Sequence, residues 1–455
     1  MSVNLEITPS NVASNGIISF RDGNPLIQFI IGEQDRALLG RSVRLCGDFA
    51  VRMASGKGDD SYVTSSSNVQ MNPRLGIYNI IDQLVIKSQV THQTIEHIRH
   101  YNRFCSSFIP VLNSLTDCVG HLSETALIMP NFECLKLSVL RNPAQRLSGN
   151  SFCAHLPCGL FNGVQAIPLA GTKGLLIEVH LAPDANVLFT LDGQGGQTTL
   201  GNAYYELTNV KLVCEATAMD ATTEGTFEYN SISTYYTSIN STNAIINFNL
   251  GLKRVLGVFA NFLPAQNINN LNADGLSTSV LFGGSTETVN SSSNNGAPIK
   301  QAIFVRGGQR FPLEYNLDTA QKNPLGSVGW AKNEKADPQL SRNFLDSVRS
   351  FSQIGRSLIS TNNTFLSSEA GGVTGSLSQT GNIGGFDKTN GEGGLVYGVG
   401  VAYDTISGDG VDFSTQNWGL QLETEIESDS PHAVYVFVHA KNTLFFNTGG
   451  IQVMS

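Results

Sequence analysis

The stretch Tyr204–Ala216, YYELTNVKLVCEA, decides the fold class of this 455-residue chain. From Thr208 onward, the apolar Val210, Leu212 and Cys214 alternate with polar side chains at the positions between them. This alternation is typical of a strand that buries one face and exposes the other. We expect the stretch to close a β-sandwich. Near the other end of the chain, Ala433–Ala440, AVYVFVHA, occupies a similar place.

Strand patterns recur on both sides of Tyr204–Ala216. In the first half we expect strands at Leu26–Ile31, Val43–Met53, Gly76–Gln89, Phe132–Leu140, Leu175–Leu181 and Val187–Leu191. In the second half we expect them at Phe227–Ile239, Asn243–Leu252, Ile299–Arg306, Arg310–Leu317, Leu395–Tyr403, Trp418–Ile426 and Ala433–Phe446. Helical periodicity is expected at Thr91–Phe104, in a weaker stretch up to Cys118, and at Pro338–Phe351.

The predicted fold class is therefore all-β, with two consecutive eight-stranded jelly-roll β-sandwiches and short flanking helices. Met219–Gly225 is a polar break between them, so residues 1–222 are predicted to form the first jelly roll and residues 223–455 the second. Two stretches rich in Gly, Ser and Asn, about 266–298 and 367–394, read as long loop insertions in the second jelly roll.

The composition favours a protein that covers much of its surface with copies of itself. Charged residues make up 14% of the chain, whereas roughly 25% is typical of soluble domains. Charged residues are also depleted in interface cores. A secreted β-rich protein with many turns would have a similar composition. The net charge of −9 makes nonspecific nucleic-acid binding unfavourable, because such binding depends on Lys and Arg side chains that neutralise phosphates.

The cysteines and the N-terminal sequence bear on the compartment. All seven cysteines lie in the first half, the number is odd, and no two are spaced as CxxC, which favours reduced and mostly buried thiols. The N-terminus, MSVNLEITPSN, has neither a basic region nor an apolar region of the kind found in signal peptides. No apolar run approaches 18 residues, so we expect no transmembrane segment.

The sharpest cluster of chemically active side chains is His92, Glu96, His97 and His100. On a helix, His92, Glu96 and His100 would share one face at intervals of four residues, which is a usable spacing for metal ligands. The order of residues does not match HExxH, because Glu96 precedes His97. We favour a solvated or interface face of a helix over a metal site.

Other motifs have simple structural explanations. Cys153 and Cys158 flank His155, and we read this segment as a loop with buried thiols rather than a metal site. The glycines of Gly193–Gly196 suit a hairpin loop and not a dinucleotide site. The acidic run that begins at Glu423 reads as the exposed face of a strand and includes Glu425, Glu427 and Asp429. The chain has no GxSxG elbow and no phosphate-binding loop. We therefore predict no catalytic, cofactor-binding or metal-binding residues and no enzymatic activity.

Five stretches, taken in order, resemble one protein family. They are GIYNIIDQLVIKSQ from Gly76, EHIRHYNRF from Glu96, YYELTNVKLVCEA from Tyr204, RGGQRFPLEYNLDT from Arg306 and VYVFVHAKNTLFFNTGGIQV from Val434. In this order they resemble the double jelly-roll major capsid proteins of icosahedral double-stranded DNA viruses, particularly the virophage and Polinton-like virus group. The resemblance covers nearly the whole chain in the order of its elements.

The resemblance implies a structural role in the virion. Three copies would form a homotrimeric, pseudo-hexameric capsomer, and capsomers would tile the faces of an icosahedral capsid assembled inside the host cell. The implied partners are other copies of the chain, a vertex penton protein, and minor capsid or cement proteins, with no sequence-specific nucleic-acid binding. The two insertions would be outward loops or trimer contacts. The family has no active site to transfer to this chain.

Two other functions are compatible with the sequence. A jelly-roll carbohydrate-binding or adhesion protein would present exposed aromatic side chains in a groove, for instance Tyr235 and Tyr236. A cupin-like metal enzyme would use His92, Glu96 and His100, and it would need them on strands that face a barrel interior.

Overall fold

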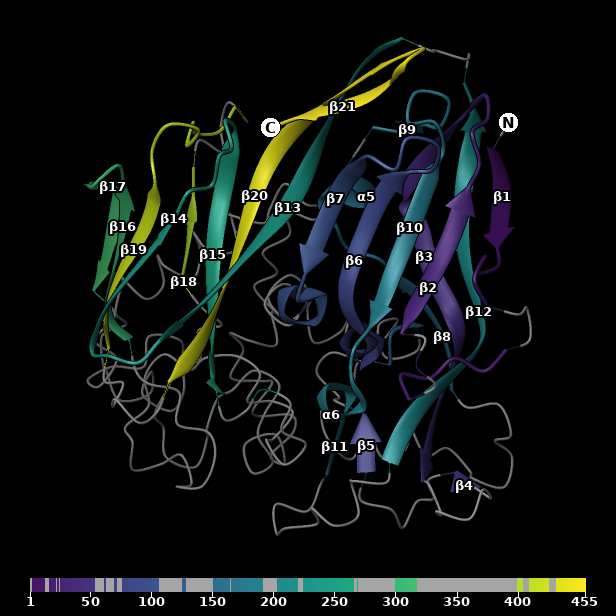
Figure 1. Ribbon diagram of the computed structural model, residues 1–455, viewed down its shortest axis with the longest axis horizontal. Helices are drawn as coiled ribbons and strands as arrows, with labels where there is room; N and C mark the ends of the chain where they lie inside the picture. The colour runs from purple at the N-terminus through teal and green to yellow at the C-terminus, as the bar shows by residue number, and fades with distance from the viewer. Residues whose placement is uncertain are drawn as a thin grey trace, which may run out of the picture.

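The computed structural model describes residues 2–12, 16–53 apart from 22 and 24, 61–62, 69–71, 76–105, 125–127, 150–190 apart from 164, 203–219, 224–265, 268, 299–316, 399–403, 409–424 and 431–455. Within these ranges the chain forms two groups of antiparallel sheets that lie side by side (Figure 1). We call β1–β12 the first sandwich and β13–β21 the second sandwich.

The first sandwich has two main sheets. Sheet 1 has the order β1-β12-β3-β4, with β8 and β9 also paired to β3. Its strands are β1 (Ser2–Ile7), β3 (Arg36–Met53), β4 (Ser61–Tyr62), β8 (Asn150–His155), β9 (Ile167–Pro168) and β12 (Ala203–Ala218). Sheet 2 has the order β2-β10-β6-β7, formed by β2 (Leu26–Ile31), β6 (Ile81–Ser88), β7 (Thr94–Arg99) and β10 (Leu175–Leu181).

Short elements complete the first sandwich. β5 (Val69–Met71) and β11 (Leu188–Thr190) form a separate two-stranded sheet. Three helical segments connect strands: the 3₁₀ helix η1 (Gly76–Ile80), α5 (Gly159–Asn162) and α6 (Asp184–Val187). A further helical turn covers residues 101–105, directly after β7.

The second sandwich also has two sheets. Sheet 3 has the order β13-β20-β15-β18, with β21 paired to the end of β20. It contains β13 (Gly225–Ile239), β15 (Val255–Pro264), β18 (Val399–Ala402), β20 (His432–Asn447) and β21 (Gly450–Met454). Sheet 4 has the order β14-β19-β16-β17, formed by β14 (Asn243–Phe248), β16 (Ile299–Arg306), β17 (Gln309–Asn316) and β19 (Trp418–Thr424).

β12 shows how the alternating sequence produces the buried face. Val210, Leu212 and Cys214 are buried, whereas Asn209 and Glu215 are exposed. At Asn209 the backbone has a φ of 52°, and the register with β3 shifts between Thr208 and Lys211. An Asn tolerates this left-handed conformation better than a branched side chain. The bulge lets one long strand follow the curvature of the sandwich while its apolar side chains stay in the core.

β20 is buried on both faces, unlike a strand at the surface of a two-layer protein. Val434, Val436 and Val438 pack in the core between sheets 3 and 4. Tyr435 and Phe437, which point the other way, pack with residues of the first sandwich. A strand covered on both sides reads as a continuous apolar run, which explains the sequence AVYVFVHA. Sheet 3 is therefore the layer shared by the two sandwiches (Figure 1).

Thr91–Phe104 is not one helix as we expected from the sequence. Residues 94–99 form strand β7, which pairs with β6, and the helical turn begins only at residue 101. Ile95 and Ile98 are both buried although they are three residues apart. The register between β6 and β7 skips Ile95, and this bulge lets both Ile95 and Ile98 join the core while His97 faces outward, so the apolar spacing imitates a helical stripe. The predicted strand at Gly76–Gln89 also differs from the structure, because its first five residues form the 3₁₀ helix η1 and strand β6 begins only at Ile81.

Other expectations have mixed outcomes. The strands at Leu26–Ile31, Leu175–Leu181 and Ile299–Arg306 are confirmed with the expected bounds. Besides β7, seven of the described strands were not predicted from periodicity, namely β1, β4, β5, β8, β9, β15 and β21. Several expectations fall outside the described residues. These are the weaker helix up to Cys118 beyond residue 105, the strand at Phe132–Leu140, the helix at Pro338–Phe351, the insertion at 367–394, and the insertion at 266–298 apart from residue 268.

Candidate functional site

The most unusual side-chain environment in the described part of the chain lies where the two sandwiches meet. β7 contributes Glu96, α5 contributes the amides of Gly159 and Leu160, and β13 contributes the amide of Ile232. α5 packs against both β3 and β13, so it lies between the two sandwiches. We call these four residues the Glu96 junction.

The Glu96 carboxylate accepts three hydrogen bonds from backbone amides. Oε1 accepts from Gly159 N at 2.9 Å and from Ile232 N at 2.8 Å, and Oε2 accepts from Leu160 N at 2.8 Å. Glu96 is only 3% exposed, so water does not replace these contacts. One carboxylate therefore ties a strand of the first sandwich, the first turn of α5 and a strand of the second sandwich together. Hydrogen bonds to a charged group are among the stronger kinds in proteins.

Two opposing effects set the pKa of Glu96. Burial dominates and raises the pKa from 4.5 to about 7, while the three amides and the Cys158 side chain lower it. Cys158 is the N-cap of α5 and accepts from Phe161 N at 3.3 Å. Burial raises the pKa of the Tyr229 hydroxyl on β13, and Glu96 adds to this increase. Glu96 thus changes its charge close to neutral pH, in a place where it contacts both sandwiches.

Close backbone approach makes the junction tight. A Cβ on Gly159 would lie 2.3 Å from the Asn230 carbonyl oxygen, so only glycine fits between α5 and β13. The Tyr229 hydroxyl donates to the Ile95 carbonyl oxygen at 2.8 Å. Both contacts join backbone of one sandwich to a residue of the other.

Aromatic and cationic side chains add further contacts between the two sandwiches beyond the Glu96 junction. The rings of Phe104 and Phe437 meet edge to face, with centroids 5.6 Å apart. Arg103 is buried and forms a side-chain hydrogen bond with Tyr435, and burial lowers the pKa of its guanidinium. The His100 ring lies against Tyr435 and Tyr236 at 4.9 and 5.6 Å. Burial is also the main cause of a lowered pKa at His100.

The titration of Glu96 should make the stability of the folded protein depend on pH. Its folded-state pKa lies above the unfolded value, so its stabilisation is complete below pH 4.5 and is lost as the pH rises through about 7. The shift from 4.5 to about 7 corresponds to about 3 kcal/mol. We expect the melting temperature of the wild type to fall between pH 5 and pH 8 relative to that of Glu96→Gln, measured by calorimetry in one buffer series.

The comparison with Glu96→Gln removes other titrations from this measurement. His97 and His100 have lowered pKa values, which destabilise the fold as the pH falls, but they are the same in both proteins. The glutamine keeps the size of the side chain and has no charge to lose. Parallel melting curves for the two proteins across this range would show that Glu96 does not titrate in the folded state.

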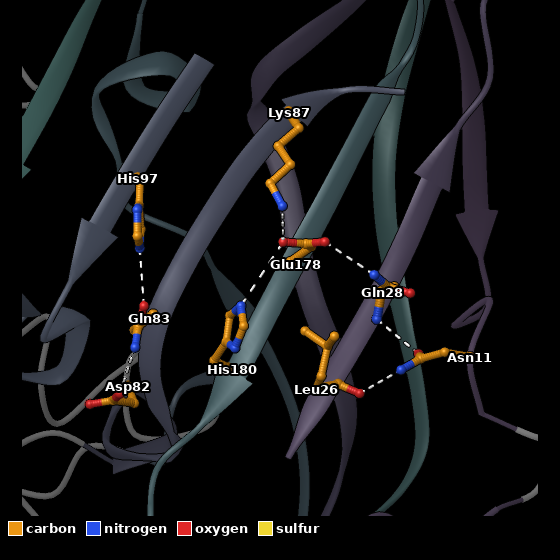
Figure 2. Close-up of polar contacts among 9 residues, drawn as sticks. All are labelled: Asn11, Leu26, Gln28, Asp82, Gln83, Lys87, His97, Glu178 and His180. Atoms are coloured by element: carbon orange, nitrogen blue, oxygen red, sulfur yellow. Dashed lines mark hydrogen bonds and ion pairs between the residues drawn. The ribbon is translucent and has the colours of Figure 1, made fainter. Parts of the chain in front are cut away.

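Sheet 2 has a second polar network on its outward face (Figure 2). Figure 2 shows Glu178 of β10 between Lys87 of β6 and Gln28 of β2. Lys87 Nζ lies 2.7 Å from Glu178 Oε2, and Gln28 Nε2 donates to Glu178 Oε1 at 3.1 Å. These contacts outweigh partial burial and hold the pKa of Glu178 below its usual range. Asn11 lies at the end of the network. Its Oδ1 accepts from Gln28 N, and its Nδ2 donates to the Leu26 carbonyl oxygen.

The structure does not bring the histidines of the first cluster together around a metal. His92 precedes β7 in a left-handed conformation, and His97 points to the outward face, where its Nε2 lies 3.0 Å from Gln83 Oε1 (Figure 2). Glu96 points to the junction and has both oxygens occupied by amides. The helical spacing that would align these groups does not exist. In the described residues, no three His, Cys, Asp or Glu side chains are placed to hold a metal ion.

The remaining sequence candidates are also separated. Cys153 lies in strand β8 and not in a loop as expected, and Cys158 begins α5. Glu423 is exposed on β19, as expected, whereas Glu425, Glu427 and Asp429 and the glycines at 193–196 lie outside the described residues. In the parts of the chain that the structure covers, no helix is long and apolar enough to cross a membrane.

Tyr235 and Tyr236 do not form a joint aromatic platform. Tyr235 packs on Phe248 beside the second core and donates to the Leu250 carbonyl oxygen at 3.1 Å. Tyr236 faces the opposite side, is 51% exposed and contacts His100 and Tyr435. Adjacent residues of a strand point to opposite faces, so a sugar ring could not stack on both.

The sequence pattern marked Glu96 as chemically interesting but placed it on a helix, on a face interpreted as solvated or at an interface rather than as a metal site. It missed the partners of Glu96, which come from segments far away in the chain. The one signal in the sequence was an acidic residue between Ile95 and Ile98, both of which are apolar. Glycine 159, which follows Cys158, gave no signal of close packing.

Comparisons with known proteins identify the fold. No family model and no curated protein matches the sequence. Among solved structures, a chain of the PBCV-1 virus capsid has a TM-score of 0.56 and 12% identity, covering 100% of this chain and 96% of its own. A chain of the Sputnik virophage has a TM-score of 0.52 and 12% identity, with coverage of 100% and 88%.

A third similar structure is the Faustovirus major capsid protein, with a TM-score of 0.52 and 9% identity, covering 98% of this chain and 90% of its own. All three similarities extend over nearly the full length of both chains, so they include both sandwiches and their connection. At these identities the likeness concerns the fold. Two antiparallel sandwiches in one chain, joined through sheet 3, have the architecture of these capsid structures, and the chain therefore has the double jelly-roll fold of viral major capsid proteins.

Proposed function

We propose that the protein is a major capsid protein whose homotrimers form pseudo-hexameric capsomers on the faces of an icosahedral double-stranded DNA virus. The observation that carries the proposal is the full-length match of two joined sandwiches to viral capsid structures. Six sandwiches from three copies approximate a hexagon, which can tile a flat face. Closed symmetry of this kind reuses one pair of complementary surfaces in every copy.

The junction supports this proposal physically. A pseudo-hexagonal unit requires the two sandwiches of each copy to hold a fixed angle. Contacts from several elements hold the two sandwiches together here. They are the Glu96 hydrogen bonds, the close backbone approach at Gly159 and the contact of Phe104 with Phe437. A flexible linker would let the sandwiches rotate and would break the repeat. We propose residues 1–222 and 223–455 as the two jelly rolls, with β12 and β13 on either side of the boundary.

The other parts of the proposal follow from a structural role. The protein would reside in the virion, would have no catalytic activity and no cofactor, and would contact neighbouring capsomers, a penton protein at the vertices, and minor or cement proteins. The low charged fraction of 14% suits surfaces that are buried between copies. The adhesion alternative has less support. Of the two tyrosines that it would use, Tyr235 packs beside the second core and only Tyr236 is exposed.

The oligomeric state tests this proposal directly. We expect the purified protein to have three times the mass of one chain by light scattering, at a value that stays constant over a tenfold dilution. Electron microscopy of the same sample should show hexagonal particles or closed shells. A well-folded protein that remains monomeric at every concentration would contradict the proposal, and a glycan array with specific binding would favour the adhesion protein instead.

A further inference from the structure

Two cysteines lie next to each other on the outward face of sheet 1, in strands far apart in the sequence. Cys46 of β3 is directly opposite Cys153 of β8 in the antiparallel register. Both are free thiols, and each forms part of a side-chain contact with the other. Their neighbours Leu45 and Ala154 point into the first core, so the two thiols point away from it.

The hydrogen-bond pattern shows which kind of pair this is. Leu156 N donates to the Val43 carbonyl oxygen, so Val43 and Leu156 are a hydrogen-bonded pair. Hydrogen-bonded and non-hydrogen-bonded pairs alternate along an antiparallel ladder. The register of Leu45 with Ala154 and of Cys46 with Cys153 therefore makes the cysteines a non-hydrogen-bonded pair.

Non-hydrogen-bonded pairs have the spacing that a disulfide needs. Their Cα atoms are about 4.5 Å apart and their side chains approach more closely than in the other kind of pair. A disulfide spans Cα atoms that are roughly 4.4–6.8 Å apart. The register therefore places the backbones of β3 and β8 at about the separation that a disulfide requires.

The two thiols differ in their exposure to solvent, and this difference determines which of them reacts first. Cys153 is partly exposed, whereas Cys46 is 7% exposed. Burial, followed by the contact with Cys153, raises the pKa of Cys46 to about 12, although Lys211 and Arg44 act against this. Cys153 is thus the thiol that an external reagent reaches, and Cys46 is placed to attack it afterwards.

We propose that Cys46 and Cys153 are a redox-sensitive pair that closes to a cross-strand disulfide when the folded protein meets a small-molecule disulfide such as oxidised glutathione. The Cys153 thiolate attacks a sulfur of oxidised glutathione, which releases one glutathione thiol and forms a mixed disulfide. The Cys46 thiolate then attacks the Cys153 sulfur and displaces the second glutathione thiol. Two protein thiols lose two electrons and two protons, and one glutathione disulfide becomes two thiols.

The disulfide would join β8 to β3 within sheet 1, which also contains β12. A crosslink between distant parts of a chain stabilises the fold by restricting the unfolded state. The proposal does not depend on the capsid function, since it rests on the register and exposure of two side chains. A protein made in a reducing compartment would remain in the dithiol form until it met an oxidising one.

Peptide mapping without reductant tests the proposal. The folded wild type is incubated with oxidised glutathione, blocked with an alkylating reagent, digested and analysed by mass spectrometry. We expect a crosslinked peptide that contains Cys46 and Cys153, together with a rise of several degrees in melting temperature that dithiothreitol reverses. In Cys46→Ser, we expect glutathione to remain attached to Cys153 and no rise in melting temperature.

A matched pair of cysteines provides the geometric control. Arg44 and His155 are the next non-hydrogen-bonded pair on the same two strands. Arg44→Cys/His155→Cys, made in a Cys46→Ser/Cys153→Ser background, should close in the same assay. A wild type that keeps glutathione on Cys153 without the crosslink, or that keeps both thiols free, would overturn the proposal. Cys214, which is buried and points into the core, should remain unmodified in every sample.

Discussion

Leu212→Asp is expected to leave almost no soluble, folded protein. Leu212 is fully buried in the first core on β12, between Ile7 of β1 and Leu45 of β3 in the register. The change loses about 2–3 kcal/mol of apolar burial and places a carboxylate without a partner in the core, which costs several kcal/mol more. Domains have a total stability of about 5–15 kcal/mol. Soluble yield and trimer mass measure the result.

Val213→Asp is the matched control for this prediction. Val213 is the next residue of β12, points to the opposite face and is partly exposed. The same new carboxylate there remains hydrated and lies between Arg44 of β3 and Glu6 of β1 in the register, one charge of each sign. We expect this variant to fold and to form trimers. If Leu212→Asp gave wild-type amounts of trimer, the assignment of β12 to the first core would be wrong, and so would the proposed boundary after residue 222.

Glu96→Ala should have the second-largest effect, and the effect should be specific to the junction. The change leaves the amides of Gly159, Leu160 and Ile232 without their acceptor in a buried place. An unsatisfied buried donor costs about 1–3 kcal/mol. Three such donors would cost more in sum, but because the site can partly relax, we expect a total loss of about 4 kcal/mol at pH 6, where Glu96 is mostly protonated in the folded wild type.

Urea denaturation and limited proteolysis distinguish loss of the junction from general unfolding. In Glu96→Ala we expect cleavage between β12 and β13, because the sandwiches separate more easily, before cleavage within either sandwich. Glu228→Ala is the control. Glu228 is also a strand glutamate, but it lies at the surface of β13 with Arg254 and Lys441 as partners. Exposed ion pairs contribute about 0–1 kcal/mol. Equal losses in the two variants would show that Glu96 does not hold the sandwiches together.

Local sequence patterns predicted most of the strands but not the nature of β7. Alternation identified β12 and β19 because each buries one face. At β7, the register with β6 shifts at Ile95, so Ile95, Glu96 and Ile98 are all buried and the alternation is interrupted. The spacing of the two isoleucines then resembled a helix. At β20 the cause is different: burial on both faces makes it a continuous apolar run, which is recognisable as a strand but does not reveal its two neighbours.

The candidate site could be predicted only in part for a related reason. The sequence showed a charged residue at position 96 and the absence of catalytic motifs. It could not show that Gly159 and Ile232 would supply amides to that residue, because backbone donors are the same for every sequence. The outward network around Glu178 was equally hidden, since Lys87 and Gln28 come from different strands.

By itself, the sequence determined the all-β class, the order of most strands and which side chains of the alternating strands face a core. Those properties depend on the period of apolar residues along one strand, which is local information. Only the tertiary structure decided that β20 serves two cores, that Glu96 connects two sandwiches, and that Cys46 meets Cys153. These depend on the register between strands far apart in the chain, and register is fixed by the packing of whole sheets rather than by any single segment.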